Sequence, residues 1–191
     1  MCVFCIFADV MKKEETSQVY QHEIIEFVTV AVQYCAYLEL SEGKSREEYV
    51  DTLLKILPLL YLKGALLPKY ELLTDYAPSD YVTEENYDIV RNNISYVMSD
   101  KDDYLDVFVE DMKYSDTPIL TSVSENLADI YQDIKNFVCA YRDGDEDNRY
   151  NAVATCKDTF VNFWGQKLTN VMRALHDVRY SDSDYEDEFE D

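Results

Sequence analysis

Residues 160–178, FVNFWGQKLTNVMRALHDV, carry the most regular apolar pattern in the chain. Large apolar side chains recur there at steps of three and four residues, which places them on one face of an α-helix. They are Phe160, Phe163, Trp164, Leu168, Val171, Met172 and Leu175. Burial of each such side chain stabilises a fold by about 1.5–3 kcal/mol. The stripe therefore indicates the inner face of a helix bundle rather than the floor of a ligand groove.

Gly165 interrupts this pattern directly after Trp164. A glycine in a helix interior costs about 1 kcal/mol relative to alanine. The simplest reason for it is the close approach of another helix or of the Trp164 indole, and a pocket lined by backbone is the alternative.

The composition favours a few long helices. The chain has 191 residues, of which 47% are hydrophobic, and it contains only four Gly and four Pro. Folds with many turns need more of those two residues. We therefore predict one all-α domain, a single bundle of five or six helices over residues 17–178. Residues 1–16 are then an N-terminal extension, and residues 179–191 are a tail.

The helical period locates five helices, over residues 17–40, 46–66, 83–98, 122–142 and 146–178. Ser45 and Ser122 are each followed three residues later by Glu, which makes a capping box at the start of two helices. Thr83 begins a third helix, and Gly43 ends the first. A short polar loop joins the last two helices, so we predict a C-terminal antiparallel helical hairpin.

Other segments carry more specific expectations. Helix 17–40 is apolar on more than one side, which places it at the centre of the bundle. Pro58 lacks an N–H, so its segment forms either one kinked helix or two short ones. Residues 68–82 and 99–120 read as irregular. Within the second, residues 104–111 (YLDVFVED) have β character, but no partner strand is identifiable.

The helix over residues 122–142 has two distinct faces. Its apolar stripe consists of Val123, Leu127, Ile130, Tyr131, Ile134, Val138 and Tyr141. Glu125, Asp129, Gln132 and Asn136 lie on the opposite, polar face. This division is typical of a helix with one side in the core and the other in solvent.

The chain is strongly acidic, with 17 Lys and Arg against 39 Asp and Glu and a formal net charge of −22. This charge disfavours direct binding to nucleic acid, because that affinity comes from neutralising phosphates, and it disfavours anionic membranes. It attracts basic proteins and divalent cations, although solubility alone also accounts for it. Residues 179–191 contain seven acidic residues and no apolar period, so we predict a disordered tail.

Five cysteines are present, and Cys35, Cys139 and Cys156 lie inside apolar helical patterns. We expect buried free thiols in a reducing cytoplasm rather than a disulfide framework. The apolar N-terminal run precedes its lysines, the reverse of a signal peptide, and no run approaches the length that spans a bilayer. We therefore predict a cytoplasmic protein. The first ten residues read as an upstream extension before a start at Met11.

Two residue pairs have the spacing of partial metal sites. Cys2 and Cys5 match half of a zinc site, and the sequence offers no second pair to complete it. His22 and Glu26 lie one helical turn apart, but a catalytic metal needs a third protein ligand. We interpret them as an exposed pair near a helix start, where Glu suits the helix dipole.

Residues 143–147, DGDED, superficially resemble a calcium loop. An EF-hand has Gly at the sixth position and Glu at the twelfth, where this chain has Asn148 and Ala154. The aspartates also fit the turn and cap of the following helix, although loose attraction of calcium remains open. The sequence therefore assigns no catalytic, metal-binding or cofactor-binding residue.

Four segments together resemble a known family: residues 26–39 (EFVTVAVQYCAYLE), 57–68 (LPLLYLKGALLP), 124–147 (SENLADIYQDIKNFVCAYRDGDED) and 160–178. The chain is similar, over about residues 17–178, to an uncharacterised family of bacterial domains of unknown function, common in Bacteroides-type organisms. Residues 129–133 (DIYQD) and the Trp164–Gly165 pair contribute most of the likeness. The resemblance implies a bacterial, cytoplasmic, mostly helical protein and supplies no activity.

These observations leave three hypotheses about function. The first is a non-enzymatic interaction module that docks a protein partner, in its sharper form a basic one. The second is a small-ligand-binding or enzymatic bundle that uses carboxylates and some of the 17 tyrosines in its core. The third is a nucleic-acid mimic that binds a basic protein. A deep polar pocket with converging carboxylates favours the second, and a solid apolar core argues against it.

Overall fold

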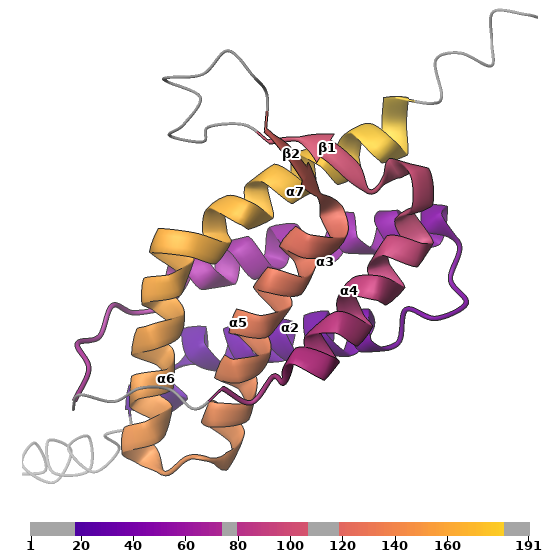
Figure 1. Cartoon of the computed structure of the whole chain (residues 1–191). Coiled ribbons are helices and arrows are strands. Elements are labelled where there is room, and N and C mark those ends of the chain that lie inside the picture. Colours follow the sequence, from indigo (N-terminus) through magenta and orange to yellow (C-terminus); the bar gives the residue numbers. More distant parts are fainter. Residues whose placement is uncertain (1–17, 74–79, 107–118, 182–191) are drawn as a thin grey trace, which may run out of the picture.

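In a computed structural model of the chain, residues 18–73, 80–106 and 119–181 are described (Figure 1). These residues form six α-helices: α2 (His22–Glu39), α3 (Arg46–Leu66), α4 (Glu84–Met98), α5 (Val123–Asp143), α6 (Glu146–Thr159) and α7 (Gly165–Tyr180). Short 3₁₀ turns precede α2 (η1, Gln18–Tyr20) and follow α4 (η2, Ser99–Lys101). The predicted all-α fold class is confirmed.

Side-chain caps fix where the helices begin. The oxygens of Ser45, Thr83, Ser122 and Asp145 accept hydrogen bonds from the free N–H groups of Glu48, Asn86, Glu125 and Asn148. A cap of this kind contributes about 1 kcal/mol. The starts predicted at Ser45, Thr83 and Ser122 are therefore confirmed. Gly43 adopts φ +79° in the turn after α2, which a residue with a side chain rarely adopts.

The first predicted helix differs in detail from the structure, and the segment around Pro58 follows one of its two predicted alternatives, a single helix. The first does not run unbroken from residue 17, because Gln21 is extended and separates η1 from α2. The hydroxyl of Tyr141 donates to the Val19 carbonyl oxygen over 2.7 Å and holds η1 against the bundle. Pro58 lies within α3, which continues through it as one helix.

α5 occupies the centre of the arrangement. Figure 1 shows it between α4 and α6, with α2 and α3 behind. It packs against α2, α4, α6 and α7, whereas α2 packs mainly against α3 and α5. The central place predicted for the helix over 17–40 therefore belongs to α5. The predicted antiparallel hairpin is formed by α5 and α6.

A continuous apolar core joins all the helices. Its largest fully buried side chains are Trp164, Tyr34, Tyr49 and Phe27. From the stripe of residues 160–178, Trp164, Leu168, Val171 and Leu175 are fully buried, as predicted. Phe163 departs from the prediction, since 49% of it is exposed.

The long helix predicted over 146–178 is broken in the middle. Phe160–Trp164 form a π-helical turn (η4), in which the N–H of Gly165 donates to the carbonyl oxygen of Phe160. A π turn rotates the following residues relative to a continuous α-helix and is a common cause of bends. Figure 1 shows the change of direction between α6 and α7. This turn explains why Phe163 faces outward.

Gly165 is enclosed, but by a different neighbour from either one predicted. A Cβ atom there would lie 2.5 Å from the carbonyl oxygen of Phe160 and 3.0 Å from its ring. The alternative of a backbone-lined pocket does not hold, because Phe160 fills the space. The indole of Trp164 instead lies against Gly64 of α3, where a Cβ atom would come within 2.6 Å of its Cη2.

The segment with β character does have a partner. β1 (Asp103–Leu105) pairs antiparallel with β2 (Leu120–Ser122), with Tyr104 opposite Thr121. The sequence missed this pairing because the strands are three residues each and the second runs directly into α5. The two strands form a small ribbon across the end of the bundle in Figure 1.

Several predictions fall outside the described residues. They are the extension 1–16, most of the segment 104–111, the pair Cys2 and Cys5, and the disorder of the tail from residue 182 onward. The tail was predicted to start at residue 179, but α7 continues to Tyr180. Within the described ranges, no helix is long and apolar enough to cross a membrane.

We predict that Gly64→Ala destabilises the protein, although alanine is normally the better helix former. The added Cβ would lie 2.6 Å from the indole of Trp164 and 3.1 Å from the ring of Phe160. Because Trp164 is fully buried, it cannot move aside cheaply. We expect a loss of about 1–3 kcal/mol in the free energy of unfolding, measured by chemical denaturation.

The matched control is the same substitution in a Trp164→Phe background. A phenyl ring does not reach Gly64, so the penalty of Gly64→Ala should shrink there. A stabilising effect of Gly64→Ala in the wild-type background would contradict the close contact.

Candidate functional site

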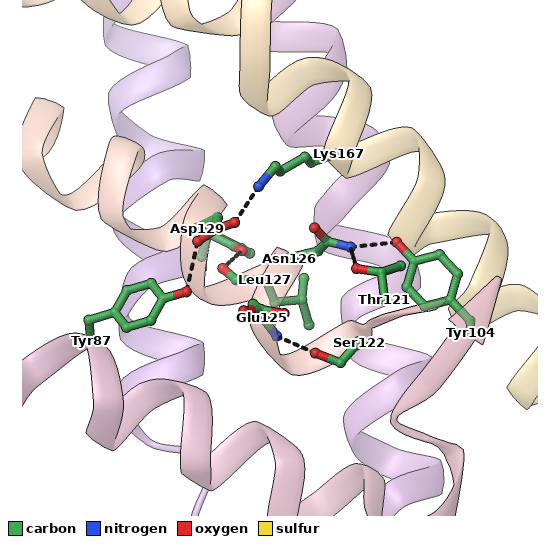
Figure 2. Close-up of polar contacts among 10 residues, drawn as sticks. Tyr87, Tyr104, Thr121, Ser122, Glu125, Asn126, Leu127, Asp129 and Lys167 are labelled. Atoms are coloured by element: carbon green, nitrogen blue, oxygen red, sulfur yellow. Dashed lines mark hydrogen bonds and ion pairs between the residues drawn. The ribbon is translucent and has the colours of Figure 1, made fainter. Parts of the chain in front are cut away.

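The first turn of α5 is anchored by polar contacts with β1, β2 and the residue before β1. Asp102 accepts from the Ser124 N–H over 2.8 Å and from the Ser124 hydroxyl over 2.6 Å. The side-chain amide of Asn126 donates to the Tyr104 hydroxyl (2.7 Å) and to Thr121 (3.1 Å), as Figure 2 shows. These contacts fix the rotation of α5, and hence the direction in which its polar face points.

Asp129 holds two other helices to α5. The Tyr87 hydroxyl of α4 donates to Asp129 Oδ1 over 2.7 Å, and the ammonium group of Lys167 from α7 pairs with Oδ2 (Figure 2). Lys167 also lies 4.4 Å from the centroid of the Phe163 ring. Burial, helped by the hydrogen bond to Asp129, raises the pKa of Tyr87, so its hydroxyl remains a donor.

Asp133 lies one helical turn beyond Asp129, and its carboxylate lacks contacts of the kind that Asp129 makes within the described residues. Its Oδ2 is buried and has no hydrogen-bond partner among the described residues. Burial, with a further contribution from the negative charge of Asp129, raises the pKa of Asp133 to about 6, against the opposing charge of Lys167. A buried acceptor without a donor costs stability, so this carboxylate is a candidate binding group.

A cavity of about 110 Å³ opens between α5 and α6 beside Asp133. We call it the α5–α6 cavity, and it is lined by Asp80, Asp133, Asn136, Phe137, Ala140, Ala152, Thr155, Cys156 and Thr159. Alanine and threonine side chains are too short to fill the space between the two helices. The polar lining consists mainly of oxygen acceptors, and none of these lining residues is Lys, Arg or His.

Asn136 connects this cavity to the start of α4. Its side-chain oxygen accepts from the N–H groups of Tyr81 (2.8 Å) and Val82 (3.0 Å). These bonds hold the segment that begins at Asp80 against α5, directly before the cap residue Thr83. The N-terminal end of α4 therefore lies next to the cavity.

Two shallower grooves run along α7. Each has a volume of about 500 Å³, and they share Arg173 and His176 in their lining. One is bounded by β1, and the other by Leu54 and Pro58 of α3. Both are open to solvent, and neither contains a buried polar atom without a partner among the described residues.

His22, Glu26 and two aspartates of residues 143–147 make local contacts in the structure. His22 Nε2 lies 3.4 Å from Glu26 Oε1 on the surface, and Glu26 also pairs with Lys63 over 2.8 Å. Asp145 caps α6, and Asp143 pairs with Arg142, so both serve the turn. Within the three described ranges, no three His, Cys, Asp or Glu side chains gather into a group able to hold a metal ion.

The three helical cysteines are buried free thiols, as predicted. Burial raises the pKa of Cys35 and of Cys156, which keeps both protonated and unreactive. Cys156 lines the α5–α6 cavity as a small apolar group.

Sequence reasoning missed the roles of Asp129, Asp133 and Asn136. It placed Asp129 and Asn136 on a solvent-facing side, whereas both are partly covered by neighbouring elements. A signal was present, since residues 129–133 put two aspartates four residues apart on one side of a helix. What the sequence could not show is that Lys167 reaches only the first of them.

The elements and contacts above define an all-helical domain with an acidic polar cluster on its central helix. The chain belongs to the family of the domain of unknown function DUF5063, whose model matches residues 18–181. It is similar to a solved structure, protein BF1032 from Bacteroides fragilis, with 47% sequence identity and a TM-score of 0.76. That match covers 86% of this chain and 97% of that one. No curated protein matches the chain.

The predicted resemblance to a Bacteroides-type family of unknown function is thereby confirmed, with nearly the same boundaries. The residues that contributed most to it are structurally central. Residues 129–133 supply Asp129, Asp133 and also Tyr131, whose hydroxyl donates to Glu39 over 2.8 Å. Trp164 and Gly165 form the end of the π turn.

We predict that Tyr87→Phe lowers the free energy of unfolding by about 1–2 kcal/mol, because it removes a hydrogen bond to a charged, partly buried acceptor. Tyr96→Phe is the matched control on the same helix, since 86% of Tyr96 is exposed. It should change stability by less than about 0.5 kcal/mol. Equal effects of the two substitutions in urea denaturation would argue against the Tyr87–Asp129 bond.

Asp133→Asn should stabilise the protein in a pH-dependent way. The raised pKa means that the folded state retains a proton that the unfolded state releases between about pH 4 and pH 6. The contribution of Asp133 to the stability of the wild type therefore declines as the pH rises through 6. We expect Asp133→Asn to be more stable than wild type by about 1–2 kcal/mol above pH 7 and equally stable near pH 4.

Thermal melts of both proteins across this pH range measure the difference. Asp158→Asn is the control, because Asp158 is an exposed aspartate on α6. It should show no gain that grows with pH. A gain at pH 7 that persists unchanged at pH 4 would contradict the ionisation of a buried Asp133.

Proposed function

We propose that this domain is a non-enzymatic interaction module that docks a basic protein partner on the outer side of α4 and the adjoining part of α5. The observation that supports it is the combination, on one helix, of unpaired carboxylates and large exposed apolar side chains. Glu84 and Glu85 are exposed in the first turn of α4. Further along the same helix, Ile89 is 51% exposed and Tyr96 is 86% exposed.

Several cations of the described residues are used in ion pairs within the chain. Arg46, Lys55, Lys63, Lys135 and Lys167 each pair with a carboxylate of the chain itself. Because acidic residues outnumber basic ones 39 to 17, carboxylates remain without cations. Such a surface draws a positively charged partner from a distance and speeds its association.

We define the acidic α4–α5 face as Glu84, Glu85 and Glu125, which belong to the first turns of these two helices. α4 and α5 pack side by side, and all three glutamates are exposed. Within the described part of the chain, the carboxylates of these three residues take part in no hydrogen bond or ion pair. Ile89 and Tyr96 lie seven residues apart and thus on one side of α4. Aromatic anchors beside a charged rim are typical of protein interfaces.

Most of the core argues against a large internal active site, since its apolar side chains form one continuous packed cluster. The α5–α6 cavity is the specific observation that favours the second candidate function, binding of a small ligand. Two carboxylates, those of Asp80 and Asp133, line this space between α5 and α6. That candidate concerns other residues of the chain, because Ile89 and Tyr96 are not among those that line the cavity.

A retention experiment with charge-matched variants tests the docking proposal. The wild type, a face variant (Glu84→Gln, Glu85→Gln, Glu125→Gln) and a control variant (Glu23→Gln, Glu42→Gln, Glu48→Gln) are immobilised and exposed to lysate of the native host. All six positions are exposed, and both variants lose the same charge. We expect a basic protein to be retained at about 0.1 M salt and released at about 0.5 M, where charges are strongly screened.

The face variant should lose this protein, and the control variant should keep it. A fourth variant, Tyr96→Ala, should weaken retention without changing its dependence on salt, because it removes apolar contact alone. Equal retention by the face and control variants would show that net charge, rather than this face, attracts the protein. Retention of nothing by the wild type at either salt concentration would reject the proposal.

A further inference from the structure

We propose that the α5–α6 cavity is a binding site for a primary alkylammonium group, with Asp133 as its anionic anchor. The site goes beyond the docking function, because it is a separate enclosed space that recognises a defined chemical group. It rests on three observations of the described residues: the cavity itself, the character of its lining, and the buried oxygen of Asp133 without a donor.

Among the described residues, no cation forms an ion pair with the carboxylate of Asp133, which lines the cavity. Asp133 Oδ2 has no hydrogen-bond partner among the residues that the structure describes. The nearby cation Lys167 is engaged by Asp129. Asp80 adds a second carboxylate to the lining, and Thr155 and Thr159 add hydroxyl groups. A ligand that donates several hydrogen bonds and carries positive charge would therefore satisfy this site.

The apolar part of the lining distinguishes an alkylammonium from an inorganic cation. Phe137 and Ala140 of α5 and Ala152 of α6 contribute apolar groups to the lining, and carbon chains pack well on such surfaces. A divalent metal ion requires six or more oxygen ligands or a compact group of charged side chains. No such group exists within the described ranges. An ammonium with a short carbon stem matches both halves of the cavity.

The volume limits the size of the group. A space of about 110 Å³ corresponds to roughly four water molecules, and so to a ligand of about four heavy atoms. Propylammonium has that size, as does the end of a lysine side chain. A free amine and a lysine from a partner protein present the same chemistry, and separate probes distinguish them.

Three single substitutions probe the cavity. Asp133→Asn keeps the shape of the side chain and removes its charge. Thr155→Leu fills the cavity from a partly exposed position on α6. Asp158→Asn, on the outer side of the same helix, removes an equal charge outside the cavity.

Titration of the full-length protein with propylammonium, followed by amide chemical shifts in ¹H–¹⁵N spectra, tests the inference. We expect saturable shifts at Asp133, Asn136, Thr155 and Thr159, with a Kd of roughly 1 mM, as suits so small a ligand. Asp133→Asn and Thr155→Leu should each weaken binding at least about tenfold, which is about 1.4 kcal/mol. Asp158→Asn should bind like the wild type.

Three further probes identify what is recognised. Tetramethylammonium has the charge but no N–H donor, and it should not bind. Nα-acetyl-lysine amide, whose ε-ammonium group is free, should bind if the side chain of a lysine can enter the cavity. If propylammonium binds and this probe does not, the site is assigned to free amines. Potassium or magnesium ions that produce the same shifts would overturn the alkylammonium assignment.

The absence of saturable shifts with propylammonium, or equal binding by wild type and Asp133→Asn, would reject the site. Neither result bears on the retention experiment, because the face variant leaves the cavity lining intact. Conversely, if the retention experiment rejects the docking proposal, the amine titration still tests the cavity.

Discussion

The contact between the Trp164 indole and the backbone of Gly64 is the constraint on which the rest of the fold depends. The indole is fully buried, stacks with Phe27 of α2 at 6.2 Å, and donates from Nε1 to the Cys156 carbonyl oxygen over 3.3 Å. It thereby joins α2 and α3 to the bend between α6 and α7. Only a glycine on α3 lets the ring approach so closely.

This bend also determines the chemistry on α5. Lys167 follows Trp164 by three residues, so the rotation imposed by the π turn directs its side chain to Asp129. Before the bend, α6 lies along α5 with alanine and threonine side chains, which leave space beside Asp133. Within the described residues, α7 after the bend thus provides the cation that pairs with Asp129, and α6 before the bend leaves the space beside Asp133.

The parts of this structure that could be predicted from the sequence are those determined by near neighbours. Ser45, Thr83 and Ser122 mark helix starts because each cap bonds to an N–H three residues away. The parts that could not be predicted depend on distant residues. Tyr87 is 42 residues from Asp129, and Lys167 is 38. The polar face of α5 has the pattern of a solvated surface, and only tertiary packing turns it into a partly buried site.

The distribution of charge gives this site its significance. Lys167 lies near two aspartates, Asp129 and Asp133, on the same face of α5. Its ammonium group pairs with Asp129, which also accepts a hydrogen bond from the Tyr87 hydroxyl. Among the described residues, the second keeps a buried oxygen without a hydrogen-bond donor, which lowers the stability of the fold. A chain with 39 acidic residues could have placed an asparagine or a second lysine here at little cost. Departures of this kind from good packing are concentrated at functional sites, because a ligand supplies the missing partner when it binds. The uncompensated carboxylate and the unfilled space beside it are therefore best understood together, as two halves of one recognition element.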